Sequence, residues 1–145
     1  MTNVVVAVTG TQQDETGDEQ RIELMTAGRY YRKNDTDYIT YDESQITGLE
    51  GTTTILKVRE NHVVLVRMGV IEQRQEFRPG ERSSSTYITP YGTMEMSVTT
   101  REMTIDFARG SGLIAITYEL EIEGQWQSTN RLAITIREEA KKDGH

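Results

Sequence analysis

The feature that most constrains the fold is an alternation of apolar and polar residues that recurs from one end of the chain to the other. No segment of ten or more residues sustains the i, i+3, i+4, i+7 apolar spacing of an amphipathic helix. Alternate residues of a strand point to opposite faces, so each alternating segment has one apolar face and one polar face. The pattern therefore predicts an all-β protein whose sheet covers a core with one face.

Clusters of turn-forming residues divide the alternating segments into about eight to ten strands. The clusters are residues 13–18, 34–35, 44–51, 60–61, 78–81, 89–92, 109–112 and 124–125. These short connections are typical of an antiparallel meander, and 145 residues fit one domain. We predict a single β-barrel domain over residues 1–137 and a charged, frayed tail over residues 138–145.

Charge and composition exclude several function classes. The chain carries 23 acidic and 16 basic residues, and its net charge of −7 repels phosphate backbones and anionic membranes. The arginines of residues 74–82 alternate with glutamates, as on a solvated strand surface. No apolar run approaches the ~20 residues of a membrane helix. We expect neither nucleic acid nor a membrane as a partner.

Cysteine and histidine are scarce. With no cysteine and with His62 and His145 as the two histidines, the sequence favours neither thiolate chemistry nor a histidine-based catalytic or metal site. The lack of cysteine, and of a basic leader before the apolar residues 4–8, favours a cytoplasmic protein. We expect no catalytic residue, metal or cofactor.

Two hairpins carry polar side chains onto the apolar face, because residues paired across a hairpin share a face of the sheet. A loop at residues 34–35 pairs Arg32 with Asp37, Tyr30 with Ile39 and Gly28 with Tyr41, and places Glu43 on the same face. A turn at residues 60–61 pairs Leu56 with Leu65, Thr54 with Arg67 and Thr52 with Gly69. Arg67 is thereby carried inward.

The same pairing rule applies to the last hairpin, whose two strands, before and after residues 123–125, each carry a row of alternating apolar residues. One row is Ile114, Ile116, Tyr118, Leu120 and Ile122, and the other is Trp126, Leu132, Ile134 and Ile136. A loop over residues 123–125 pairs Ile122 with Trp126 and unites the rows, whereas a loop of residues 124–125 separates them, so we predict the three-residue loop. Met94, Met96 and Val98 are expected to fill the core, and the later phase change predicts a bulge near residues 100–102.

Polar residues on predicted core faces are the candidate ligand-binding site. They are Tyr41, Glu43, Thr52, Thr54, Arg67, Tyr87 and Thr89. Buried charges need partners, so the first interpretation is a structural ion pair between Glu43 and Arg67. In the second, Arg67 holds the anionic head of a ligand whose apolar body lies against the barrel lining. A register error that leaves one of the two charges in water is the third.

Five segments, in order, resemble a known family. They are IELMTAGRYY (22–31), YITYDES (38–44), GLEGTTT (48–54), VRMG (66–69) and YITPYG (87–92). Together they span nearly the whole chain and resemble the YwiB-like family of small bacterial proteins. The resemblance implies a lipocalin-like, calycin-type closed barrel. Because the members are largely uncharacterised, it implies no catalytic or binding residues.

Two function classes follow from these observations. The barrel could hold a small apolar or amphipathic anionic molecule. Alternatively, side chains fill the barrel completely and the protein is a structural or interaction module, such as a homodimer joined through exposed strand surface. An enzyme is less favoured than either. A continuous apolar cavity that opens to water distinguishes the first class from the second.

Overall fold

The computed structural model describes residues 1–139, which form ten strands and one short 3₁₀ helix. The strands are β1 (Thr2–Gln13), β2 (Glu19–Lys33), β3 (Thr36–Asp42), β4 (Thr52–Arg59), β5 (His62–Gly69), β6 (Gln73–Phe77), β7 (Arg82–Thr89), β8 (Gly92–Ala108), β9 (Ser111–Ile122) and β10 (Gln125–Glu138), with η1 (Gln45–Thr47) between β3 and β4. The predicted tail beyond residue 139 lies outside the described residues. Within residues 1–139, no helix is long and apolar enough to cross a membrane.

All ten strands belong to one antiparallel sheet. Its order is β6-β5-β4-β3-β2-β1-β10-β9-β8-β7, so the first and last strands of the chain pair with each other. The two edge strands, β6 and β7, approach each other and are joined by a backbone bridge between Glu72 and Ile88. The result is a nearly closed barrel, which confirms the predicted all-β meander. We call the gap between β6 and β7 the seam.

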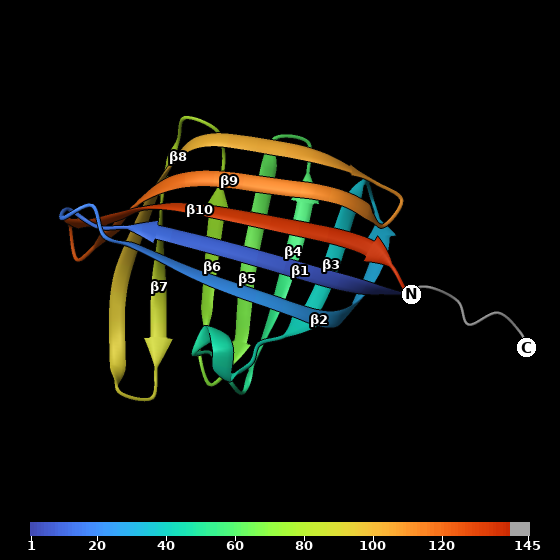
Figure 1. Ribbon diagram of the computed structural model, residues 1–145, viewed down its shortest axis with the longest axis horizontal. Coiled ribbons are helices and arrows are strands. Elements are labelled where there is room, and N and C mark those ends of the chain that lie inside the picture. Colours follow the sequence, from blue (N-terminus) through green and yellow to red (C-terminus); the bar gives the residue numbers. More distant parts are fainter. Residues whose placement is uncertain (140–145) are drawn as a thin grey trace, which may run out of the picture.

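The barrel is flattened, and its strands cross. In Figure 1, β1, β9 and β10 run across the front of β3–β7, and the long strands β2 and β8 bend from one layer into the other. The bend in β8 coincides with a shift in its pairing with β9 between Thr100 and Glu102. This is the bulge that the phase change predicts, and it lets one strand serve both layers.

The two early hairpins have the predicted registers. Gly28 pairs with Tyr41 across the β2–β3 hairpin, and Thr54 pairs with Arg67 across the β4–β5 hairpin. Asn34 and Asp35 both have positive φ, 52° and 62°, as a two-residue turn with the right-handed twist requires. A Cβ on Gly28 would lie 2.8 Å from Val6 Cγ2, so this position admits only glycine without a rearrangement.

The last hairpin differs from the prediction in one respect. Its loop is Glu123-Gly124, both with positive φ, and Trp126 pairs with Glu121 on the outer face. A bulge between Trp126 and Ser128 then restores the register that unites the apolar rows, with Leu132 opposite Ile116. The three-residue loop and the inward tryptophan are therefore wrong. The outward position gives the indole N–H an acceptor, Glu119 Oε1, at 2.9 Å.

The core fills one end of the barrel. Its most deeply buried members share an inward position on their strands and include Val4, Val6, Ile39, Leu56, Val58, Val63, Ile114, Ile116, Ile134 and Ile136. We call the end that carries the β2–β3, β4–β5 and β8–β9 turns the closed end. The other end, with η1 and the β1–β2, β7–β8 and β9–β10 turns, is the open end.

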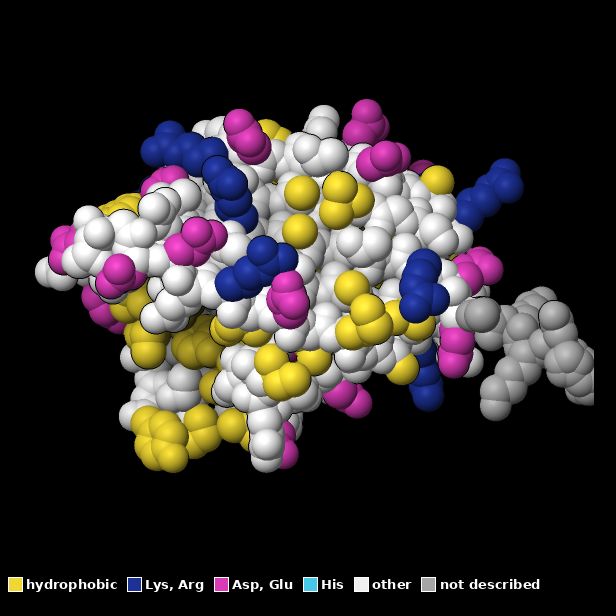
Figure 2. All heavy atoms as spheres, viewed as in Figure 1, with side chains coloured by type: hydrophobic (Ala, Val, Ile, Leu, Met, Phe, Trp, Pro, Cys, Tyr) yellow, Lys and Arg dark blue, Asp and Glu magenta, His cyan; other side chains and the backbone are white. Residues whose placement is uncertain are grey.

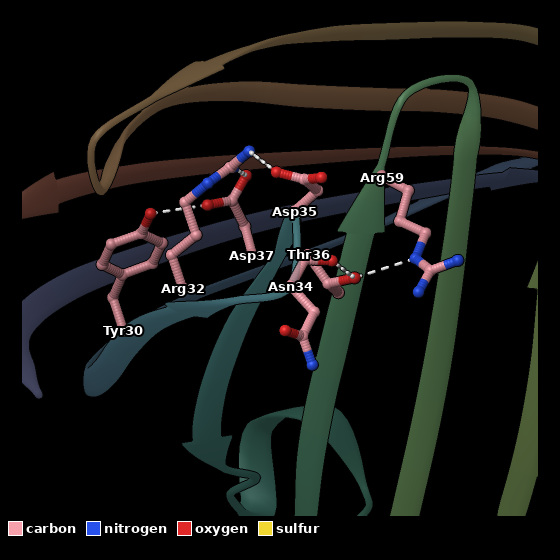
Figure 3. Close-up of polar contacts among 7 residues, drawn as sticks. All are labelled: Tyr30, Arg32, Asn34, Asp35, Thr36, Asp37 and Arg59. Atoms are coloured by element: carbon pink, nitrogen blue, oxygen red, sulfur yellow. Dashed lines mark hydrogen bonds and ion pairs between the residues drawn. The ribbon is translucent and has the colours of Figure 1, made fainter.

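A polar cluster covers the closed end, as Figure 3 shows. The Tyr30 hydroxyl donates to Asp37 Oδ1 at 2.5 Å, and Arg32 Nη1 donates to Asp37 Oδ2 at 2.9 Å. Nearby, Arg59 Nε donates to Thr36 Oγ1 at 2.8 Å and links β4 to β3. The predicted pairing of Arg32 with Asp37 is thus an ion pair. These contacts compensate the buried Asp37 carboxylate, and we assign them a structural role.

Candidate ligand-binding site

A cavity with two lobes occupies the open end of the barrel. The smaller lobe has a volume of about 260 Å³ and the larger about 450 Å³. Figure 2 shows the molecule hollowed between the front layer and the β7–β8 turn, with hydrophobic side chains in the hollow. The lobes share several lining residues, and these are Gln12, Thr47, Leu49, Arg67, Tyr118, Asn130 and Leu132. Arg67 therefore lies at the junction of the two lobes.

The larger lobe is mainly apolar. Its lining comes from strands on both sides of the seam and includes Leu65, Phe77, Met94, Met96, Leu120 and Ile122. Met94, Met96 and Val98 face inward as predicted, but at this end they line a space that they do not fill. The sequence pattern identifies these side chains as inward-facing but gives no volume, so it left a filled and a hollow barrel as alternatives.

Arg67 uses little of its hydrogen-bonding capacity. It lies on β5 between Thr54 of β4 and Gln73 of β6. Its Nη1 donates to Gln73 Oε1 at 2.7 Å. Its Nε is buried and has no hydrogen-bond partner among the residues that the structure describes. The Arg67 side chain thus lines both lobes and carries a buried donor that no group of the described residues accepts.

A chain of hydrogen bonds begins at Arg67 on β5, passes through side chains of β6 and reaches β7 across the seam. Gln73 Nε2 donates to Ser85 Oγ at 3.0 Å, Ser85 Oγ donates to Gln75 Oε1 at 2.7 Å, and Gln75 Nε2 donates to the Ser83 carbonyl at 3.2 Å. Because a guanidinium can only donate, Gln73 must turn its amide oxygen to Arg67. This choice fixes the direction of every later bond in the chain. We call these four side chains, of residues 67, 73, 85 and 75, the seam chain.

The predicted ion pair between Glu43 and Arg67 is not formed. Among residues 1–139, no ion pair within 4.0 Å involves either side chain. Thr54 Oγ1 donates to Glu43 Oε2, while Gln73 draws Arg67 towards β6. Both charged side chains line the smaller lobe. The predicted register of the β4–β5 hairpin was right, but Glu43 is hydrogen-bonded to the neutral Thr54 and Arg67 to the neutral Gln73.

Two tyrosines place hydroxyl-bearing rings beside these charges. Burial raises the pKa of Tyr41, the charge of Glu43 raises it further, and the charge of Arg67 opposes both effects. Burial also raises the pKa of Tyr118, again opposed by Arg67. At neutral pH both phenols are therefore protonated. Tyr41 lines the smaller lobe and Tyr118 lines both.

The structure separates the sequence-predicted site residues. Tyr41, Glu43 and Arg67 meet in the smaller lobe, and Tyr87 lines the larger one. The others serve backbone and side-chain contacts outside the lining. Thr52 Oγ1 accepts from the Ile71 N–H at 3.2 Å, and Thr89 Oγ1 donates to the Gly92 carbonyl at 2.9 Å. Thr54 is fully buried and contacts the site through its hydrogen bond to Glu43.

Three lining residues escaped the sequence analysis. Tyr118 was assigned to the core row, Asn130 was placed on the inward face of its strand but not proposed as a site residue, and Gln73 was not considered. Asn130 lies in the inward row two positions from Leu132, which was a usable signal. Gln73 lies in a strand whose sequence, Gln-Arg-Gln-Glu-Phe, is polar on both faces until its last residue. Its phase was signalled only by the apolar residues Ile71 and Phe77, which flank it at the same alternate positions and are buried.

The site has no metal-ligand cluster. Within residues 1–139, no group of three or more histidine, cysteine, aspartate or glutamate side chains could hold a metal ion. His62, the first residue of β5, contacts Glu76 through Nε2 at 3.1 Å on the barrel wall. The cavity is lined instead by an arginine, two phenols and an apolar lobe.

Fold and cavity together define a small antiparallel β-barrel protein with a two-lobed cavity at its open end. The chain belongs to the family described as "Domain of unknown function (DUF1934)", which matches residues 6–134. It is 28% identical over 122 residues to the uncharacterized beta-barrel protein YwiB of Bacillus subtilis (strain 168), covering 84% of each chain. It also superimposes on the crystal structure of the ywiB protein from Bacillus subtilis with a TM-score of 0.86 and 27% identity. That match covers 96% of this chain and 93% of the other.

Proposed function

We propose that this protein binds a small amphipathic molecule with an acidic head in the cavity at the open end. The head accepts hydrogen bonds from Arg67, and the apolar body lies in the larger lobe. The observation that carries the proposal is the Arg67 side chain, which lines both lobes and whose buried Nε has no partner among the described residues. The absence of cysteine supports a cytoplasmic setting for this binding.

Arg67 is suited to bind an anion because it is held in place before the ligand arrives. Its bond to Gln73 is the first of the seam chain, whose remaining members are buried. A side chain that is already ordered loses little conformational entropy on binding. Bonds from a guanidinium to a carboxylate are charge-assisted and stronger than bonds between neutral groups. The desolvated Nε would thus gain more from an acid than from an alcohol.

The larger lobe is suited to an apolar body. Its volume, about 450 Å³, falls within the roughly 300–1,000 Å³ of small-molecule pockets. Met94 and Met96 are flexible, polarisable side chains that adapt to irregular apolar shapes. A chain of about ten carbons is therefore a reasonable first probe.

The test compares decanoate with decanol in a thermal-shift assay on three proteins. Ligands that bind only the folded state raise the melting temperature. Arg67→Met removes the charge and keeps an apolar stem. Arg74→Met is the matched control, because Arg74 lies on the adjacent strand with a side chain 59% exposed on the outer face.

We expect decanoate to stabilise the wild type and Arg74→Met, and to stabilise Arg67→Met little more than decanol does. Equal stabilisation of all three proteins would contradict the role of Arg67. If no acid in a broader screen stabilises the wild type, and the protein elutes as a dimer from a sizing column, the structural or interaction module replaces the binding protein.

A further inference from the structure

We infer that the head of the ligand is zwitterionic, with a carboxylate on Arg67 and an ammonium group on Glu43. This inference rests on the proposed function and specifies the class of ligand. An α-amino acid with a long apolar side chain is the simplest molecule of that class.

The first observation is that the smaller lobe presents two opposite charges that do not neutralise each other. Glu43 and Arg67 both line it, and no ion pair within 4.0 Å joins them. Opposite charges in a partly desolvated site attract strongly at contact. Here each is instead held by a neutral neighbour, Thr54 or Gln73, on its own side of the lobe.

The second observation is the unused capacity of both groups. The hydrogen bond to the Glu43 carboxylate within the described residues comes from Thr54 Oγ1 to Oε2, whereas a carboxylate has about four acceptor sites. The Arg67 Nε–H has no acceptor among the same residues. Within the described residues, Glu43 thus keeps acceptor sites and Arg67 keeps a donor that no other group of the protein takes, and both side chains line a single lobe.

The third observation is the wall shared by the two charges. Tyr41 is 5% exposed, and the pKa of its phenol responds to Glu43 and to Arg67 in opposite directions. Strand pairing places it beside both charges, because Tyr41 lies opposite Thr54, and Thr54 pairs with Arg67 and donates to Glu43. A head group at this wall of the lobe can contact Arg67 with one end and Glu43 with the other.

These observations predict a selectivity. A fatty acid would satisfy Arg67 but leave the Glu43 carboxylate unpaired, and a phosphate monoester would bring two negative charges towards that carboxylate. An alkylammonium ion would satisfy Glu43 and leave Arg67 unpaired. A zwitterion pairs with both side chains, because its carboxylate meets Arg67 and its ammonium group meets Glu43.

The experiment measures the affinities of four probes with matched chains by isothermal titration calorimetry at pH 7. The probes are 2-aminodecanoate, decanoate, decylammonium and decyl phosphate. We expect 2-aminodecanoate to bind the wild type at least about tenfold more tightly than decanoate, and decyl phosphate to bind least tightly of the acids. This comparison needs no variant.

Two variants locate the effect. Glu43→Gln should reduce the preference for 2-aminodecanoate over decanoate to about twofold or less. Asp42→Asn is the matched control, because Asp42 is the preceding residue, is exposed and accepts from Thr53 on the outer face. It should keep the preference.

The outcomes separate this inference from the proposed function. If decanoate binds the wild type as tightly as 2-aminodecanoate does, the zwitterion is wrong, although an acid-binding cavity stands. If the preference survives Glu43→Gln, Glu43 is not its source and the inference is also overturned. If none of the probes binds, the proposed function fails with it.

Discussion

Ser85 offers a sharp test of the seam chain, because its hydroxyl links two buried amides. Ser85→Ala leaves Gln75 Oε1 without its donor and takes the oxygen acceptor from Gln73 Nε2, which keeps the weaker acceptor Met96 Sδ at 3.6 Å. An orphaned buried polar group costs ~1–3 kcal/mol, so one full and one partial loss amount to about 2–4 kcal/mol of unfolding free energy.

The matched control is Ser84→Ala, one position along the same strand. Ser84 points outward and shares a hydrogen bond of 2.9 Å with Ser97, so the expected cost is about 0.5–1.5 kcal/mol. Urea denaturation of both variants gives the two free energies. Hydrogen exchange should show faster opening of β6 and β7 in Ser85→Ala, with β3 and β4 unchanged. If Ser85→Ala is no less stable than Ser84→Ala, the seam chain does not hold the barrel closed.

Three further predictions concern the core, the alkaline limit and the excluded partners. Ile116→Ala should cost roughly 2–5 kcal/mol in a denaturant melt through lost burial and a residual cavity, whereas Thr117→Ala, on the other face, should cost less than ~1. Burial, and then the hydrogen bond to Asp37, raise the pKa of Tyr30 from 10.0 to about 12, so its contribution to stability is complete below pH 10 and is lost as the pH rises to about 12. Urea melts across this range should show that loss, and Tyr30→Phe should reduce its slope. Fluorescence anisotropy with duplex DNA at physiological salt should give no sub-micromolar binding, because of the net charge of −7.

Much of the barrel could be predicted because turn residues and alternation fix register. Asn34 and Asp35 determine the β2–β3 pairing down to Gly28 and Tyr41, and residues 60–61 determine that of Thr54 and Arg67. The same logic failed at Trp126 because a bulge can change the phase after the turn. Sequence alternation locates such a bulge only where a long strand shows both phases, as β8 does.

The site was less predictable than the fold because pairing places a Cβ and not the end of a long side chain. Glu43 and Arg67 were correctly placed on inward faces, but Thr54 and Gln73 direct them apart. Gln73 and Gln75 share their phase with the buried Ile71 and Phe77, but their bonds to Ser85 across the seam are a tertiary feature that the sequence does not record. The volume of the cavity depends on how side chains from strands far apart in the sequence pack around it, which no local pattern records.

The Arg67 Nε–H itself reports most directly on the central claim. In a ¹⁵N–¹H spectrum of the arginine side chains, its signal is identified as the one that disappears in Arg67→Met. The account predicts that decanoate shifts this signal downfield and slows its exchange with water, because the buried donor gains a charged acceptor, while decanol does not. If decanoate binds and the Arg67 Nε–H signal stays where it is, the head lies elsewhere and the account of this cavity is wrong.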